Sequence, residues 1–242
     1  MAHLGINLGH DRSAAIVSDG KIQIAIEQER LDRIKHSVGF LNQSVDDMSK
    51  IELPDQAIKY CMDALELDWS DINSITANMP GIDNSVQVLK HSLPDATHSK
   101  IHQIPSHHLS HAYSAYWPSN FDEAIILSVD ASGSAKNGRT ESFSIYTGKG
   151  SDITLLHSET VTSHLAALST LGFLYEFISK EAGFVSNISE SLQIAESGKL
   201  MGLSAFGRKQ KHWNKWIETT PGSFELKINS YDIALEIECL RK

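Results

Sequence analysis

His107 and His111 stand four residues apart in the run His-His-Leu-Ser-His, directly after a Pro-Ser pair. Pro and Ser are typical of a helix start, so the run predicts the first turns of a helix. Residues four apart share a helix face, so the two imidazoles could hold one ion, whereas His108 would point elsewhere. Asp130, at the end of a predicted strand, could complete an open divalent metal site. A bare pair with this spacing is as often two solvated or buried histidines, so the surrounding pattern must decide.

Asp11 and Asp130 each follow a predicted strand and precede a turn of small residues, a second strand, a hairpin and a third strand. This repeat predicts two related α/β domains with a cleft between them. Backbone N–H groups and the hydroxyls of Ser13, Ser132 and Ser134 could bind phosphates there, while the two aspartates orient a metal or a nucleophile. Either turn taken alone is better explained as a hairpin connection, and only the duplication favours a functional role.

Hydrophobic periodicity places the elements that carry these residues. Strands are predicted where apolar residues alternate or run continuously, at Leu4–Leu8, Ala14–Val17, Ile22–Ile26, Ile72–Ala77, Ile101–Ile104, Ala124–Val129, Ser142–Tyr146, Ile153–Val161 and Phe224–Ile228. Besides the helix at His107, helices are predicted at Pro54–Leu67, Asn84–His91, Leu165–Lys180, Ser189–Glu196 and Tyr231–Leu240. The glycine-punctuated segment Ser197–Leu203 is predicted to be a loop.

The composition describes an ordinary soluble chain of 242 residues, 41% hydrophobic and 21% charged. The net charge of −9 argues against a surface that grips a nucleic-acid backbone or an anionic membrane. The sequence shows no signal-peptide pattern, no apolar stretch long enough to span a bilayer, and only two cysteines without a disulfide framework. We therefore expect a cytoplasmic protein with neither nucleic acid nor membrane among its partners.

Common phosphate-binding and hydrolase motifs are absent from the sequence. Ser197–Leu203 lacks the spacing of a Walker loop, and no G-x-G-x-x-G follows a predicted strand. The chain also lacks a G-x-S-x-G nucleophile elbow. Hydrolase-triad chemistry is therefore unsupported.

Five ordered blocks of sequence point to a known family: Ile6–Ala15, Glu27–His36, His107–Ala112, Ser128–Gly133 and Gly198–Leu203. In sequence and order they resemble the O-carbamoyltransferases, which include the nodulation-factor, cephem and aminoglycoside antibiotic carbamoyltransferases. The blocks extend over about residues 4–207, so the match is much more specific than any single motif.

The resemblance implies an α/β fold of the actin-like, sugar-kinase-like or ribonuclease H-like type, closest to the tRNA threonylcarbamoyl transferase. It places a first subdomain at residues 1–120 and a second at residues 121–242. The chain ends on a predicted helix with no closing strand, so we expect the second copy to be incomplete, or to be completed by a partner.

The resemblance also implies a reaction that consumes carbamoyl phosphate and ATP. Carbamoyl adenylate forms first in a separate C-terminal domain, and its carbamoyl group then moves to a hydroxyl of a small-molecule acceptor. The second step would belong to the part of the protein seen here. Because further ligands of the family lie in sequence beyond this chain, we expect the chain alone to bind metal and nucleotide poorly.

Residue roles follow from the resemblance by motif position. It makes His107, His111 and Asp130 ligands of an iron-type or other divalent metal, and a histidine–carboxylate set also accepts zinc or manganese. His10 would be the general base for the acceptor hydroxyl, and Lys35 the lysine that neutralises charge near the adenylate. The residues that would contact the nucleotide and its phosphates are Asp11, Ser13, Ser132, Gly133 and Lys199.

Two other functions are carried forward. A threonylcarbamoyl transferase acting on tRNA would share the fold, but the net charge of −9 argues against it because tRNA binding needs a basic surface. A non-catalytic or split module that binds a nucleotide or a complementing chain, or that forms a homodimer, would explain an incomplete second copy.

Overall fold

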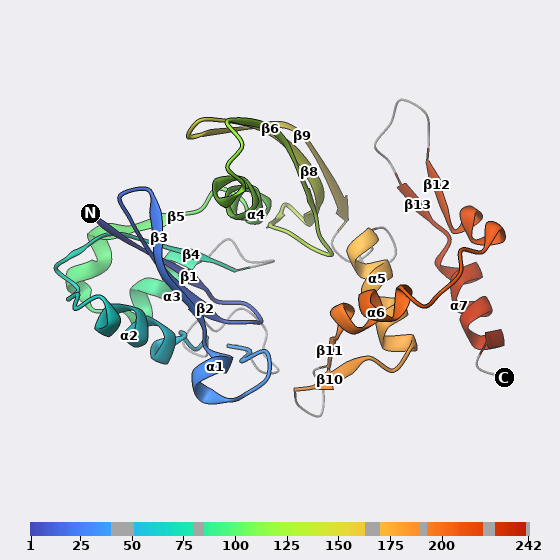
Figure 1. Ribbon diagram of the computed structural model, residues 1–242, viewed down its shortest axis with the longest axis horizontal. Helices are drawn as coiled ribbons and strands as arrows, with labels where there is room; N and C mark the ends of the chain where they lie inside the picture. Colours follow the sequence, from blue (N-terminus) through green and yellow to red (C-terminus); the bar gives the residue numbers. More distant parts are fainter. Residues whose placement is uncertain (40–50, 80–84, 163–169, 189–192, 220–225, 241–242) are drawn as a thin grey trace. The chain divides into compact units, whose positions relative to one another are not determined.

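A computed structural model describes residues 1–39, 51–79, 85–162, 170–188, 193–219 and 226–240 (Figure 1). The chain divides into two compact units. The first comprises Met1–Ser110 with Ile188–Leu192, and the second comprises His111–Asn187 and Gln193–Lys242. The division thus comes ten residues before the predicted boundary after residue 120, and it falls inside one helix.

The first unit is built on a five-stranded sheet with the order β3-β2-β1-β4-β5. β1 (Ala2–Asn7), β2 (Ser13–Ser18) and β3 (Lys21–Glu27) form an antiparallel meander. β4 (Ile72–Asn78) and β5 (Ile101–Gln103) extend the sheet in parallel on the other side of β1. Parallel neighbours need crossover connections, and here these contain helices.

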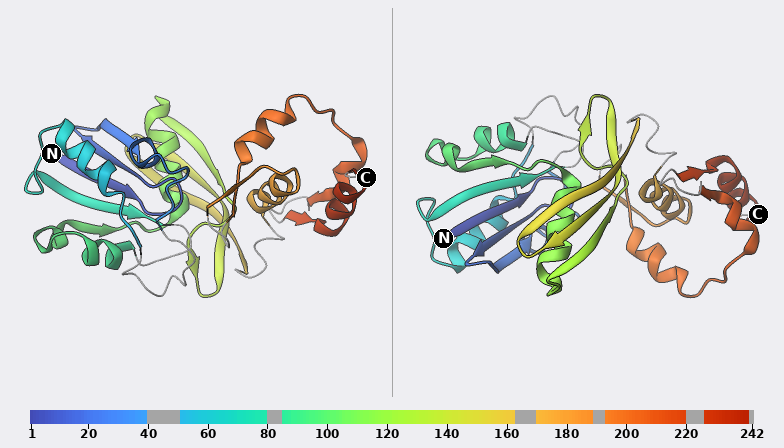
Figure 2. Two further views of the ribbon diagram at one scale, coloured as in Figure 1. Left: turned by 90° about the horizontal axis from the view of Figure 1, so that it is seen from below. Right: turned by 90° about the horizontal axis from the view of Figure 1, so that it is seen from above.

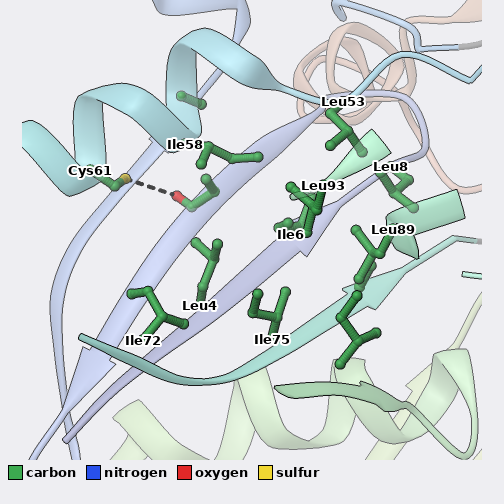
Figure 3. Packing of buried hydrophobic residues seen from close by; sticks show 14 of the residues in the cluster. Leu4, Ile6, Leu8, Leu53, Ile58, Cys61, Ile72, Ile75, Leu89 and Leu93 are labelled. Carbon is green, nitrogen blue, oxygen red and sulfur yellow. Dashed lines mark hydrogen bonds between the residues drawn. The ribbon is translucent and has the colours of Figure 1, made fainter. Parts of the chain in front are cut away.

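The hydrophobic core of the first unit lies on one face of this sheet (Figure 3). Leu4, Ile6 and Ile75 point from the sheet toward α2 (Asp55–Ala64) and α3 (Ser85–Ser92), both of which lie on that face (Figures 1 and 2). Alternate residues of a strand face opposite sides, so the alternating apolar residues of β1 and β4 give this sheet one buried face. Short helical segments complete the unit: α1 (Glu29–Asp32) and the 3₁₀ turn Asp95–Lys100.

The second unit repeats the meander. β6 (Glu123–Val129), β8 (Arg139–Lys149) and β9 (Asp152–Thr162) pair antiparallel in sequence, and the short β7 (Ala135–Lys136) pairs with the start of β8. Figure 2 shows the long strands β8 and β9 side by side. The predicted duplication of strand, acidic turn, strand, hairpin and strand is therefore confirmed in the described residues.

Helix α4 (His107–Tyr116) begins in the first unit and continues into the second. Its last residue, Tyr116, packs its ring so closely on Gly148 of β8 that a Cβ at this glycine would lie 2.8 Å from it. The remaining described elements of the second unit are α5 (Leu171–Glu181), β10 (Val185–Asn187), β11 (Gln193–Ala195), α6 (Ser197–Ser204), the 3₁₀ helix Lys211–Trp216, β12 (Ile217–Thr219), β13 (Leu226–Ile228) and α7 (Ser230–Leu240).

Two element predictions are wrong. The helix predicted over Ser189–Glu196 is replaced, where the structure describes it, by β11, which forms a hairpin with β10. The loop predicted over Ser197–Leu203 is instead helix α6. Its two glycines, Gly198 and Gly202, weaken helix propensity. Among the described residues outside the backbone of this helix, no atom lies within 4 Å of a Cβ added at either position. The start of the helix predicted from Leu165 lies outside the described residues.

The predicted fold class is confirmed. The chain is an actin-like α/β protein, with a 3-2-1-4-5 mixed sheet in its first unit and a second copy of the same opening meander in its second. Both acidic turns therefore occupy the same position, directly after the first strand of a meander.

Candidate metal centre and acidic turns

Helix α4 carries the predicted histidine pair. His107 is buried in its first turn and His111 is half exposed in the next. Because the two residues are four apart on one helix, the helix itself holds their side chains on the same face. The intervening His108 is fully buried, as expected for a residue that points away from this face.

Asp130 follows β6 and lies beside His111 within the second unit. The His111 Nε2 and Asp130 Oδ2 atoms are 3.5 Å apart, and the aspartate side chain is 28% exposed. This is longer than a charge-assisted hydrogen bond. It is close to the separation of about 3.4 Å expected for two atoms that each lie about 2.1 Å from one tetrahedral ion.

The potential ligand atoms of His107, His111 and Asp130 all lie within 4.8 Å of one another. Two imidazole nitrogens and a carboxylate oxygen are a donor set typical of iron, zinc or manganese. The donor chemistry and the spacing therefore fit a divalent cation, with positions left open for other ligands.

Asn78 at the end of β4 supports this reading of His107. Its Oδ1 atom lies 2.9 Å from His107 Nδ1. An amide oxygen accepts hydrogen bonds only, so Nδ1 carries the proton and Nε2 has the lone pair that a metal would need. Metal-binding histidines usually donate their other ring N–H in this way, which fixes the ring and its tautomer.

The turn after Asp130 is closed by hydrogen bonds to the start of β8. Gly133 donates its backbone N–H to the Glu141 carbonyl at 2.9 Å, and the Ser132 hydroxyl lies 2.9 Å from that of Thr140. The predicted phosphate contacts of Ser132 and Gly133 would have to share or exchange these bonds. Their role stays a prediction.

Helix α5 begins against the same turn. Its N-cap Thr170 accepts a hydrogen bond from Phe173 N and donates its hydroxyl to the Ala131 carbonyl at 3.0 Å. A Cβ at Gly172 would lie 2.2 Å from Ala131 N, so only glycine fits this contact. The backbone next to Asp130 is therefore held from both sides.

The acidic turn of the first unit has a different structure. Asp11 has a left-handed backbone (φ 56°), and its carboxylate lies between two imidazoles. Its Oδ2 is 2.5 Å from His10 Nδ1, and its Oδ1 is 2.8 Å from His36 Nδ1. Burial raises the pKa of Asp11, but hydrogen bonds from His10 and His36 outweigh it and hold the pKa below its ordinary value.

Arg12 ties this turn to the loop around Ser37. The guanidinium is 6% exposed and donates to the carbonyls of Ser37, Glu52 and Leu53 at 2.6–3.1 Å. Five donors in a fixed fork suit this role. Arg12 is therefore a structural anchor of the turn, because its guanidinium is occupied by backbone carbonyls of the same unit.

Lys35 and Lys199 lie in different surroundings. Lys35 is exposed, beside His36 in the loop that Arg12 anchors. Lys199, in the first turn of α6, pairs with the buried carboxylate of Glu196. Neither role predicted for these lysines is tested by the structure.

The open face of the first sheet holds a pocket of about 540 Å³. The small cross-strand neighbours Gly5, Ala15 and Ala25 line it, together with Ser13, a predicted phosphate contact. The polar residues that line the rest of the pocket are Asn7, Glu27, Arg30, Thr76, Asn78 and Ser110.

Sequence analysis assigned no role to three residues that support the predicted site residues: Asn78, which contacts His107, His36, which contacts Asp11, and Arg12, which anchors the first acidic turn. Asn78 ends a strand without any motif of its own, so no local signal could identify it. His36 stands in the Glu27–His36 block, next to Lys35. Its place in a block that resembles the family was the signal that could have found it.

A second group of potential ligand atoms, from Asp11, Glu29 and His36, also lies within 4.8 Å. Hydrogen bonds already account for it. Glu29 Oε2 accepts the His36 backbone N–H at 2.8 Å, and Asp11 binds the His36 ring. A cation need not be invoked here.

The sheet topology and the group of two histidines and one aspartate together describe an actin-like α/β protein with a candidate metal site. A model of the carbamoyltransferase N-terminus family matches residues 87–239, which include helix α4, Asp130 and helix α6. Since the match covers more than half of the chain, the chain belongs to the carbamoyltransferase N-terminal family.

Two curated proteins are similar to this chain over most of its length. The chain is 27% identical to the nodulation protein NolNO of Sinorhizobium fredii, over 84% of this chain and 28% of the relative. It is 28% identical to the uncharacterized protein sll1178 of Synechocystis sp., over 82% of this chain and 33% of the relative. The chain thus spans about a third of the length of the curated relatives it matches.

Solved structures show a weaker likeness. YeaZ from Pseudomonas aeruginosa aligns with a TM-score of 0.41 and 11% identity, over 67% of this chain and 68% of that chain. A putative N-acetylmannosamine kinase from Listeria monocytogenes aligns with a TM-score of 0.37 and 10% identity, over 86% and 72% of the two chains. Similarity at this level carries no argument about function. In the part of the chain that the structure describes, no helix has the length and apolarity needed to cross a membrane.

Proposed function

We propose that the chain is the acceptor-side part of an O-carbamoyltransferase, which moves a carbamoyl group from carbamoyl adenylate to a hydroxyl of a small molecule. The single observation that carries the proposal is the group formed by His107, His111 and Asp130, which lies inside the segment matched by the family model. Carbamoyl phosphate and ATP would supply the adenylate through sequence that this chain does not contain.

Residues of helix α4 and the aspartate that follows β6 would hold a divalent cation. When bound, such a cation would act as a Lewis acid on the carbamoyl carbonyl and the phosphate of the adenylate. His107 Nε2, His111 Nε2 and the Asp130 carboxylate are the donors that would hold it. Asn78 keeps His107 in the required tautomer, and the packing of α5 on Ala131 keeps the backbone beside Asp130 in place.

His10 would act on the acceptor. In the transfer step the acceptor oxygen forms a bond to the carbamoyl carbon, the bond from this carbon to the phosphate oxygen breaks, and AMP leaves with the electron pair. The hydroxyl proton goes to an imidazole nitrogen of His10, whose ring is more than half exposed and therefore accessible. Lys35, in the loop next to His36, would offset negative charge on the adenylate.

The test uses the chain loaded with Fe²⁺, Zn²⁺ or Mn²⁺ in turn and offered preformed carbamoyl adenylate with a set of hydroxyl-bearing acceptors. Because the chain alone is expected to bind both poorly, metal and adenylate are supplied in excess. We expect weak but metal-dependent binding of the adenylate by calorimetry and carbamate esters detected by mass spectrometry. His111→Ala should abolish both. His91→Ala, which removes an exposed histidine from helix α3, should leave both unchanged.

Two outcomes would contradict the proposal. Equal adenylate binding by the wild type and His111→Ala would remove the metal site from the mechanism. Preference for threonylcarbamoyl adenylate over carbamoyl adenylate would favour the alternative transferase that the sequence left open.

A further inference from the structure

The carboxylate of Asp11 holds two histidine rings at once, and all three residues belong to the first unit. His10 Nδ1 lies 2.5 Å from one carboxylate oxygen and His36 Nδ1 lies 2.8 Å from the other. Both contacts are within hydrogen-bond distance. In each ring the nitrogen facing the carboxylate is Nδ1, which leaves Nε2 on the far side.

The protonation of both rings follows from this geometry. An ionised carboxylate accepts hydrogen bonds and cannot donate them, so each Nδ1 must carry a proton. A neutral imidazole with a proton on Nδ1 has its lone pair on Nε2. The lowered pKa of Asp11 keeps the carboxylate ionised near neutral pH, although burial of this group acts in the opposite direction.

The turn is built to hold the carboxylate in place. Asn7 Nδ2 donates to the carbonyls of both His10 and Asp11 at 3.0 Å. Asp11 N donates to the His36 carbonyl at 2.6 Å. The His36 backbone N–H in turn binds Glu29 Oε2 at 2.8 Å. The contacts between carboxylate and rings are therefore part of a connected network and not a chance encounter of surface side chains.

We propose that Asp11 is a positioning residue that fixes His10 in the tautomer with a proton on Nδ1 and so makes Nε2 its basic nitrogen. This inference rests on the proposed function of His10 as the general base. When the acceptor hydroxyl gives its proton to Nε2, the ring becomes an imidazolium and keeps its Nδ1–H bond to the carboxylate, which stays ionised. His36 occupies the second oxygen and prevents the carboxylate from rotating away from His10.

The tautomer can be measured without any activity. Long-range ¹H–¹⁵N correlation spectra of histidine-labelled chain report which ring nitrogen carries the proton, with the His10 and His36 signals assigned from His10→Gln and His36→Gln. In the wild type at neutral pH we expect both rings to carry the proton on Nδ1. In Asp11→Asn we expect His10 to shift toward the Nε2–H tautomer and its pKa to fall, because the imidazolium loses its anionic partner.

Asp19→Asn is the matched control. Asp19 also has a left-handed backbone (φ 51°), and its side chain is 87% exposed at the β2–β3 turn. Asparagine tolerates this conformation, so both variants remove one charge without straining the backbone. Asp19→Asn should leave the His10 spectrum unchanged.

Results that overturn the positioning role can be told apart from results that overturn the proposed function. A wild-type His10 with its proton on Nε2, or the same tautomer and pKa in Asp11→Asn, would refute the role of Asp11 whether or not carbamoyl transfer is observed. If the tautomer behaves as expected and His10→Gln nevertheless transfers carbamoyl groups at the wild-type rate, the error lies in the proposed function. If both hold, Asp11→Asn should lower kcat and shift the pH at which kcat is half maximal downward, because the pKa of the general base falls, while KM for the adenylate changes little.

Discussion

The two meanders share an order of strands but differ in what surrounds them. In the first, the apolar face of β1 is covered, and Leu4 is 1% exposed. In the second, the apolar residues on one face of β6 are uncovered, with Ile125 68% and Leu127 62% exposed, while Ile126 on the other face is buried. The buried face of β6 and β8 is instead rich in hydroxyl groups from Ser128, Ser142 and Ser144.

The acidic turns of the two meanders also differ in the groups that surround their aspartates. Asp11 is fixed by two imidazoles and lies next to the buried anchor Arg12. Asp130 accepts the N–H of the following residue at 2.6 Å and lies 3.5 Å from the His111 ring of helix α4. Both rings that contact Asp11 come from the loops of the first unit, whereas the ring beside Asp130 belongs to the helical pair with the predicted metal-ligand spacing. We therefore propose a positioning role for the first turn and a metal-binding role for the second.

The largest effect should come from matched leucine truncations in the two meanders. Leu4→Ala removes a buried side chain from the first core and should lower the free energy of unfolding by about 2–5 kcal/mol. Leu127→Ala removes an exposed side chain and should change it by no more than about 0.5 kcal/mol. Chemical denaturation measures both. Equal losses would show that the face of β6 is covered in solution.

Truncation of Arg12 should have the next largest effect. Arg12→Ala leaves the buried carbonyls of Ser37 and Leu53 without their donor and should cost about 2–4 kcal/mol. Arg12→Lys keeps a charge but loses the fork, so we expect a smaller loss. Denaturation curves decide this, and an unperturbed Arg12→Ala would mean that the turn does not depend on its anchor.

Gly172 tests how tightly the second turn is held. Gly172→Ala places a methyl group against Ala131 and should cost about 1–3 kcal/mol through forced backbone shifts. Gly198→Ala in helix α6 is the control, because in the described part of the chain an added Cβ there has no contact within 4 Å outside its own helix backbone. It should be neutral or stabilising by up to about 1 kcal/mol. Thermal unfolding of the two variants gives the comparison, and similar midpoints would argue against the contact.

The smallest effect concerns pH. Because the folded-state pKa of Asp11 lies below its unfolded value, the native state binds this proton more weakly, and the stabilisation is present above about pH 4. It is lost as the pH falls through the folded-state pKa. The stability difference between the wild type and Asp11→Asn should therefore shrink on acidification below about pH 4. Urea melts across pH 2–7 measure it, and a difference that grows toward acid pH would reverse the assigned sign.

The sequence predicted the fold and the positions of most elements because alternating apolar residues and the Asp-Gly hairpin are local signals. β1, β2, β3 and β6 each lie within two residues of their predicted bounds. The β11 hairpin was mistaken for a helix because the pairing of Gln193–Ala195 with Val185–Asn187 is not visible in either segment alone. The hydrophobic periodicity of one segment does not show which other segment it pairs with.

In the candidate site, too, local features could be predicted from the sequence and long-range contacts could not. Helical spacing was enough to place His107 and His111 on one face. Asp130 was named as a possible third ligand from its place after a strand and from the family resemblance, and its distance from His111 could not be predicted from spacing. The support from Asn78 and the contact of His36 with Asp11 join residues 29 and 25 positions apart. Such contacts depend on how the chain folds back on itself, so they could not be predicted from spacing.

The central claim is that helix α4 and the end of β6 hold a divalent cation, and metal content tests it most directly. Because the chain alone is expected to bind metal weakly, equilibrium dialysis uses rising concentrations of Fe²⁺, Zn²⁺ and Mn²⁺ followed by elemental analysis. Binding should be saturable and approach about one ion per wild-type chain and per His91→Ala chain, with strongly reduced retention in His107→Ala, His111→Ala and Asp130→Asn. All variants should keep the wild-type circular dichroism spectrum. Equal metal content in the wild type and all three site variants would contradict the account.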